Sequence, residues 1–145
     1  MNYRRQLSDC SRYLPIAIVA TLVTGCANQH EQPPFDELNE LTAHEWVLED
    51  INNQGIIDNS RVTLNFGDEG RVAGRASCNR YFAVYSVDGD TLNIQQAATT
   101  MMACPEALMN QERRFLDALQ GVHSFEIDAT GALVLTGENS RILAR

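Results

Sequence analysis

Short segments in which apolar and polar residues alternate, separated by glycine-containing turns, constrain the fold of this chain most. Within residues 61–66, Val62, Leu64 and Phe66 alternate with polar neighbours, and this pattern indicates a strand with one buried face. The turn at 67–70, Gly-Asp-Glu-Gly, then leads into a hairpin partner. The expected strands cover 46–51, 61–66, 71–77, 81–87, 91–95, 122–128, 132–136 and 140–144.

The pattern changes to a helical period after the fifth of these segments. Pro105 suits the first turn of a helix, Leu108 and Phe115 lie on one stripe, and Gly121 is a typical terminator. A shorter helical segment begins at Phe35. We therefore expect an α+β, mainly β domain. Its curved or barrel-like antiparallel sheet would have about eight strands, with the one inserted helix covering an opening.

The N-terminal region has a different composition. Three arginines precede an apolar run at 14–23, which ends in the sequence Val-Thr-Gly-Cys at 23–26. The run has the length of a signal-peptide core and is too short to span a bilayer. The region resembles a bacterial lipoprotein signal, in which Cys26 would become the lipid-bearing first residue. An ordinary secretory signal followed by a chance cysteine is the alternative.

This resemblance divides the chain into three parts. We expect a signal peptide at 1–25, a polar tether at 26–34 that ends in two prolines, and one folded domain at 35–145. A lipid on Cys26 would attach the protein to a membrane. Because Ala27 is not the aspartate that typically retains such proteins in the inner membrane, we expect an outer-membrane lipoprotein that faces the periplasm.

Charge excludes several classes of function. Three of the 11 basic residues and one of the 19 acidic residues lie in the signal, so the rest carries a net charge of −10. Such a body repels phosphate backbones and anionic lipid surfaces, and we expect no nucleic-acid partner. All basic residues are arginines. The chain therefore has no lysine for Schiff-base chemistry or for a phosphate-binding P-loop.

Cys78 and Cys104 are the cysteines that remain after Cys10 is lost with the signal and Cys26 is acylated. In an oxidising compartment such a pair favours a disulfide. Closing a loop over a sequence separation of 26 residues would stabilise the fold by about 3.5 kcal/mol in the chain-entropy model. Two buried free thiols are the alternative.

Two motifs carry a resemblance to a known family. They are Cys-Asn-Arg-Tyr-Phe at 78–82 and Thr-Met-Met-Ala-Cys at 100–104, preceded by Trp-Val-Leu at 46–48. From about Leu41 to Leu143, the chain resembles the META domain, and within it the HslJ-like lipoproteins. The resemblance implies a small β-rich domain without an established enzymatic reaction. It also implies an association with the envelope, heat shock and novobiocin resistance.

A candidate partner surface lies in the first motif and just after it. Arginine and tyrosine are favoured interface anchors, so Asn79, Arg80, Tyr81 and Tyr85 could grip a partner. Asn79 could instead have a structural role, since a short polar residue at a strand entry can bond nearby backbone. The methionines at 101, 102 and 109 would either line an apolar groove or fill the core.

Catalytic and metal sites are not expected. Cys104 precedes a helix N-terminus, which lowers a thiol pKa, but the histidines at 30, 44 and 123 have no motif around them. Asp88 and Asp90 flank a glycine in a tight turn, which is too short for a calcium loop. We expect no catalytic residue, no metal and no cofactor.

The sequence therefore predicts a monomeric, non-enzymatic envelope lipoprotein that binds or stabilises another envelope component, with a link to stress or novobiocin tolerance suggested by the family. One alternative is a pilotin-like assembly factor that receives a client helix or acyl chain in an apolar cleft. The other is a thiol-dependent enzyme.

Overall fold

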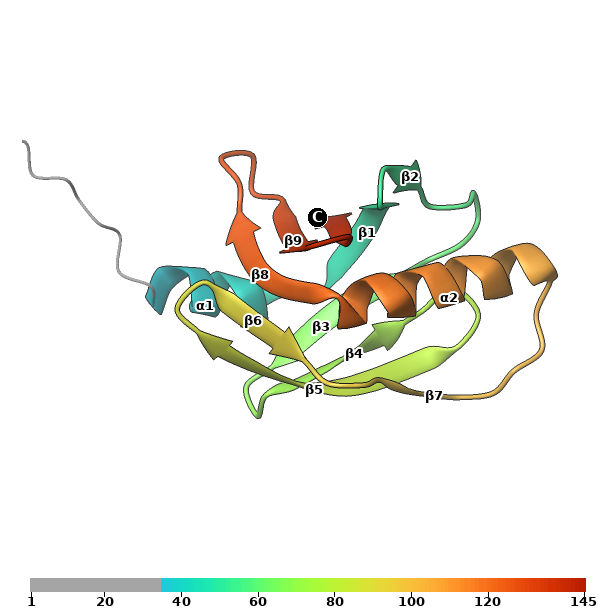
Figure 1. The fold of residues 1–145 in the computed structure, drawn as a ribbon, viewed down its shortest axis with the longest axis horizontal. Helices are drawn as coiled ribbons and strands as arrows, with labels where there is room; N and C mark the ends of the chain where they lie inside the picture. Colours follow the sequence, from blue (N-terminus) through green and yellow to red (C-terminus); the bar gives the residue numbers. More distant parts are fainter. Residues whose placement is uncertain (1–34) are drawn as a thin grey trace, which may run out of the picture. The chain divides into compact units, whose positions relative to one another are not determined.

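The computed structural model describes residues 35–145, which form a closed β-barrel with two helices (Figure 1). Eight antiparallel strands follow one another around the barrel in the order β1, β3, β4, β5, β6, β8, β9 and β10, and β10 pairs with β1. Two further strands lie off this ring: β2 pairs with β1, and β7 pairs with β5. The predicted mainly β fold with one inserted helix is confirmed.

The elements have the following bounds. The helices are α1 (Phe35–Ala43) and α2 (Glu106–Gln120). The strands are β1 (Trp46–Ile51), β2 (Gln54–Gly55), β3 (Thr63–Gly67), β4 (Arg71–Arg75), β5 (Arg80–Asp88), β6 (Thr91–Ile94), β7 (Ala98–Thr99), β8 (Val122–Ile127), β9 (Leu133–Gly137) and β10 (Arg141–Ala144). The eight predicted strands agree with the barrel strands to within about two residues at each end.

Side chains fill the interior of the barrel. Val62, Leu64 and Phe66 are at most 1% exposed, so the alternation in this segment does mark an inward face. Trp46 is fully buried, and its indole Nε1–H donates to the carbonyl of Leu41 at 2.9 Å. An eight-stranded barrel is just wide enough for side chains to fill it, and here they do.

The two helices cover opposite ends of the barrel (Figure 1). Helix α2 contacts β1 and β10, and the ring of Phe115 lies edge-on to Tyr81 of β5 with centroids 5.2 Å apart. Because β5 lies across the ring from β1 and β10, α2 crosses the opening at which β1 ends and β5 begins. We call this opening the α2 end. Helix α1 contacts β3 and β8 at the other opening, the α1 end.

The pairing between two neighbouring strands of the barrel, β6 and β8, is short. Strands β6 and β8 share a single register pair, Thr91 with Ser124, and the N–H of Phe125 donates to the carbonyl of Asp90 at 3.3 Å. Strands β8 and β9, in contrast, pair along their whole length.

The predictions for the N-terminal region concern residues that precede Phe35. The predicted signal peptide, the predicted tether and the predicted lipidation of Cys26 all concern residues outside the described part of the chain. Neither helix in residues 35–145 is long and apolar enough to cross a membrane.

Candidate functional site

The two tyrosines of the predicted partner surface are structural. Tyr81 and Tyr85 point into the barrel, and their hydroxyls donate to the carbonyls of Thr63 and Gly67, each at 2.9 Å. Burial raises the pKa of both phenols, and the nearby charge of Asp68 raises that of Tyr85 further. The prediction that these tyrosines form a partner surface is therefore wrong. Both side chains are buried, and both hydroxyls already donate to backbone carbonyls of this chain.

Asn79 is also buried, and it organises three segments at the α2 end. Its backbone N–H and its Nδ2 donate to the two carboxylate oxygens of Glu112 on α2, at 2.7 and 2.9 Å. Its Oδ1 accepts from the hydroxyl of Thr100 at 2.9 Å and from the N–H of Met102 at 2.8 Å. Of the two readings of Asn79, the structure matches the structural one.

Gln111, the neighbour of Glu112, makes a second set of buried hydrogen bonds. Its Oε1 accepts from the N–H of Ile57 at 2.8 Å, and its Nε2 donates to the hydroxyls of Ser60 and Ser77. Ser77 has a φ of 91°, a conformation that persists only where surrounding contacts fix it. These bonds tie α2 to the loops before β3 and before β5.

Sequence analysis missed both α2 residues, although one signal was present. Glu112 lies four residues after Leu108 and three before Phe115, on the same helical stripe. A carboxylate on an otherwise apolar stripe is rarely buried without a partner. Gln111 gave no such signal, because its partners are loop groups.

A disulfide joins Cys78 to Cys104, with the sulfur atoms 2.03 Å apart. It links the loop before β5 to the residue just before the first turn of α2, so neither sulfur is a free thiol. Together with Asn79, it fixes the loop at residues 100–104. The side chains of Met101 and Met102 nevertheless point outward, 97% and 57% exposed. Of the two readings of the methionines, core filling is therefore wrong for Met101 and Met102.

The outer side of β4 and β5 carries the exposed members of the site. The register places Arg71 opposite Val84, Ala73 opposite Phe82, and Arg75 opposite Arg80. Directly opposed residues share a face, and Phe82 and Val84 are 60% and 46% exposed. We call this surface the arginine face; it comprises Arg71, Ala73, Arg75, Arg80, Phe82 and Val84.

Within residues 35–145, the arginines of the arginine face form no ion pair. The two salt bridges in the part of the chain that the structure describes join Arg61 to Glu45 and Arg145 to Glu49. Neither involves the face. An open hollow of ≈ 390 Å³ lies alongside, with Arg71 and Arg80 among its walls. Arg80 is thus the one residue of the predicted partner surface that lies outside.

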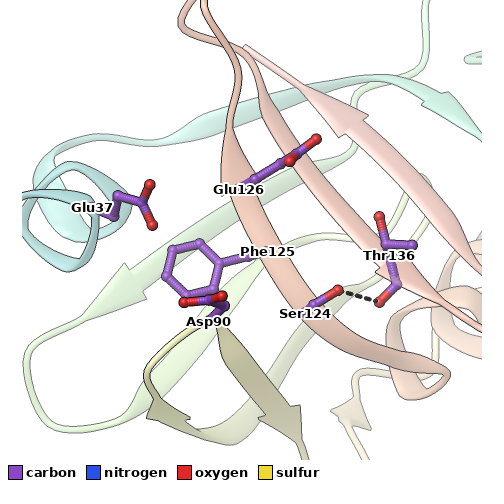
Figure 2. A pocket seen from close by; sticks show the side chains of 6 residues that line it. All are labelled: Glu37, Asp90, Ser124, Phe125, Glu126 and Thr136. Atoms are coloured by element: carbon purple, nitrogen blue, oxygen red, sulfur yellow. Dashed lines mark hydrogen bonds between the residues drawn. The ribbon is translucent and has the colours of Figure 1, made fainter. Parts of the chain in front are cut away.

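A second hollow of ≈ 430 Å³ lies at the α1 end (Figure 2). Its lining includes Glu37 of α1, Asp90 of the turn between β5 and β6, and Phe125 and Glu126 of β8. No three His, Cys, Asp or Glu side chains within residues 35–145 are grouped closely enough to hold a metal ion. Acidic walls alone identify no ligand.

The candidate catalytic groups do not assemble. His44 packs against Trp46 at the α1 end with ring centroids 4.1 Å apart, whereas Cys104 lies at the α2 end. His123 is exposed on β8, and His30 lies outside the described residues. The structure therefore brings no histidine to a cysteine in residues 35–145.

Comparison with known proteins gives a consistent result. The family model of the META domain matches residues 39–145, which confirms the resemblance of the motifs to the META domain. No curated protein matches the chain.

Three solved structures share the fold. A protein from Burkholderia xenovorans solved by NMR has a TM-score of 0.60 and 18% identity, covering 97% of this chain and 95% of its own. A second NMR structure has a TM-score of 0.60 and 20% identity, covering 77% and 92%. A crystal structure of a DUF4847 family protein from Bacteroides vulgatus has a TM-score of 0.54 and 15% identity, covering 74% and 95%. At these identities the likeness extends to the fold alone.

Proposed function

Because this chain belongs to the META domain family, whose model spans nearly all of its folded domain, we propose that it is a non-enzymatic envelope lipoprotein that binds another envelope component. The observation that carries the proposal is the arginine face. It exposes Phe82 and Val84 between three arginines without ion pairs among the described residues. Exposed apolar groups beside unpaired guanidiniums are typical of a binding surface.

The anchor is part of the proposal. The apolar run at 14–23 and the Val-Thr-Gly-Cys sequence at 23–26 support cleavage before Cys26 and acylation of its sulfur. Ala27 supports delivery to the outer membrane. Intact-mass analysis of membrane-extracted protein should show a chain that begins at Cys26 and carries acyl mass. A soluble product cleaved elsewhere would refute the anchor.

Binding accounts for the described residues better than the two alternatives do. A pilotin-like factor needs an apolar cleft, but each of the two hollows has charged residues among its walls. A thiol-dependent enzyme needs a thiolate, and Cys78 and Cys104 are joined in a disulfide. No observation on residues 35–145 favours either alternative.

The binding role can be tested in cells. A photo-crosslinking residue placed at Phe82 should give a discrete adduct with an envelope component. The same residue at Asn93, which is exposed on β6, is the matched control and should give none. Equal crosslinking from both positions, or from neither, would contradict the proposal. Growth of a deletion strain with novobiocin would then show whether the family's association with tolerance extends to this protein.

A further inference from the structure

The arginine face and the loop beside it at residues 100–104 specify the chemistry of a partner. We propose that the partner docks with an extended, acidic protein segment, in which two carboxylates four residues apart flank an apolar side chain. The carboxylates pair with arginines, and the apolar side chain covers Phe82. This inference rests on the proposed function and names the chemistry of its partner.

Charge complementarity supports an anionic segment. The chain beyond its signal carries a net charge of −10, yet the arginine face gathers three of its eight arginines without an ion pair within residues 35–145. A guanidinium presents a planar fork of donors that matches a carboxylate. The face therefore brings three guanidiniums together on one surface, where none has a carboxylate partner within residues 35–145.

The spacing of the arginines supports an extended segment. Arg71 and Arg75 lie four residues apart on β4, about 13 Å at the rise of a strand. Ala73 lies midway between them and is opposite Phe82. A partner strand with carboxylates at its first and fifth residues has the same spacing. Its third side chain then lies over the Ala73–Phe82 pair.

The loop at residues 100–104, here called the methionine loop because it carries Met101 and Met102, extends this surface beyond β5. The N–H of Thr100 donates to the carbonyl of Arg80 at 3.0 Å, so the loop begins beside the first residue of β5. Asn79 and the disulfide fix the backbone of the loop, while Met101 and Met102 remain exposed. A loop that is already ordered loses little entropy on binding. Methionine also adapts to irregular apolar partners.

The surroundings of the face favour a narrow segment over an anionic bilayer. The turn before β4 carries Asp68 and Glu69, and the turn after β5 carries Asp88 and Asp90. Both turns border the face at its Arg71 end, because Arg71 pairs with Gly67 and β5 ends at Asp88. A flat anionic surface would meet these four carboxylates as well, whereas a single strand lying along β4 would not.

The test uses the full lipidated protein in phosphatidylcholine nanodiscs. The probe is a fluorescent peptide, Glu-Thr-Phe-Thr-Glu-Thr-Phe-Thr-Glu, and anisotropy measures its binding. The double variant Arg71→Gln/Arg75→Gln should weaken binding about tenfold, since each exposed charge pair contributes a few-fold. Phe82→Ala should weaken it about fivefold. Arg141→Gln, at an exposed arginine on β10, is the matched control and should leave binding unchanged.

Two further measurements show whether a loss of binding comes from the charges themselves. Thermal unfolding of each variant should match that of the parent, because all the changed side chains are exposed. A peptide with Gln in place of every Glu should bind at least tenfold more weakly. Equal binding of the two peptides, or unchanged binding by Arg71→Gln/Arg75→Gln, would overturn the proposal.

The test gives one result if the face binds a lipid bilayer and another if the protein has no envelope partner. If phosphatidylglycerol in the nanodiscs displaces the peptide from the face, the surface binds lipid and the acidic-segment proposal is overturned. Peptide binding without an in-cell crosslink at residue 82 would support the segment chemistry and refute the envelope partner. A crosslink without peptide binding would overturn the segment chemistry alone.

Discussion

The two ends of the barrel are closed by different means. At the α2 end, polar ties predominate: Gln111 and Glu112 hold the loops before β3 and before β5 by hydrogen bonds, and a disulfide joins Cys78 to Cys104. At the α1 end, apolar burial predominates. Leu41 is fully buried, and the indole of Trp46 donates its one hydrogen bond to that residue's carbonyl.

Chain connectivity explains the difference. Helix α1 precedes β1 by two residues, so burial of one face suffices to hold it in place. Helix α2 follows a loop whose last backbone bond to a strand is the one from Thr100 to Arg80, and the loops beneath it have backbone groups that need partners. Side chains of α2 supply those partners. The polar ties therefore hold the loops as much as the helix.

The largest expected effect tests the apolar end. Phe66 is 1% exposed and lies edge-on to Tyr85, with ring centroids 5.1 Å apart. Phe66→Ala should lower the free energy of unfolding by about 4 kcal/mol, because it removes a buried ring and leaves a cavity. Urea unfolding measures the change, and Asn65→Ala at the exposed neighbour is the control. An unchanged midpoint for Phe66→Ala would mean that this end does not depend on apolar burial.

The next effect tests the covalent tie. Replacing both Cys78 and Cys104 with serine should cost about 3.5 kcal/mol, because the unfolded chain regains the freedom of a 26-residue loop. Urea unfolding of protein made in the periplasm gives the difference. Non-reducing peptide mapping should find the two cysteines in one linked fragment. Two alkylatable thiols in the folded, oxidised protein would contradict the bridge.

A slightly smaller effect isolates the hydrogen bonds of the α2 end. Glu112→Ala leaves the backbone N–H and the Nδ2 of Asn79 buried without their acceptor, and it should cost about 3 kcal/mol. Glu106→Ala, on the exposed first turn of the same helix, is the control and should stay within about 0.5 kcal/mol. Equal costs at the two positions would remove the contrast between the ends.

The smallest effect is a pH dependence in the turn between β8 and β9. The carboxylate of Asp128 accepts from the hydroxyl and the N–H of Thr130 and from the N–H of Ala132, and these bonds lower its pKa. Because the pKa of Asp128 is lower in the folded state, its ionised form stabilises the fold at any pH above the unfolded-state pKa of about 3.9. This stabilisation is lost as the pH falls through the folded-state pKa. Asp128→Asn should therefore destabilise the protein at neutral pH and less so in acid. A difference that stays constant with pH would contradict this reading.

The barrel could be predicted from sequence because its strands are long enough to show their period. Val62, Leu64 and Phe66 carry that signal within one segment. Strands β2 and β7 have two residues each, too few for any period. The inward direction of Tyr81 and Tyr85 was visible in principle, since alternation places Arg80 on the opposite face from both.

The candidate site was harder to predict than the fold. The arginine face depends on the register that sets Arg75 of β4 opposite Arg80 of β5. A single strand shows which residues share its own face, but not which residues of its neighbour they meet. The ties from α2 depend on loop geometry, which has no period. Pairing between distant segments, more than local pattern, determines where this protein can bind.

Closure of the ring by β1 and β10 affects how the chain must fold. Leu48 pairs with Ala144, and Ile51 with Ile142, across almost the whole length of the domain. Until β10 has been synthesised, one edge of β1 stays open, and an open edge recruits strands of other chains. Such distant pairing is also slow to form. The interval before β10 pairs with β1 is therefore when this protein is most exposed to aggregation.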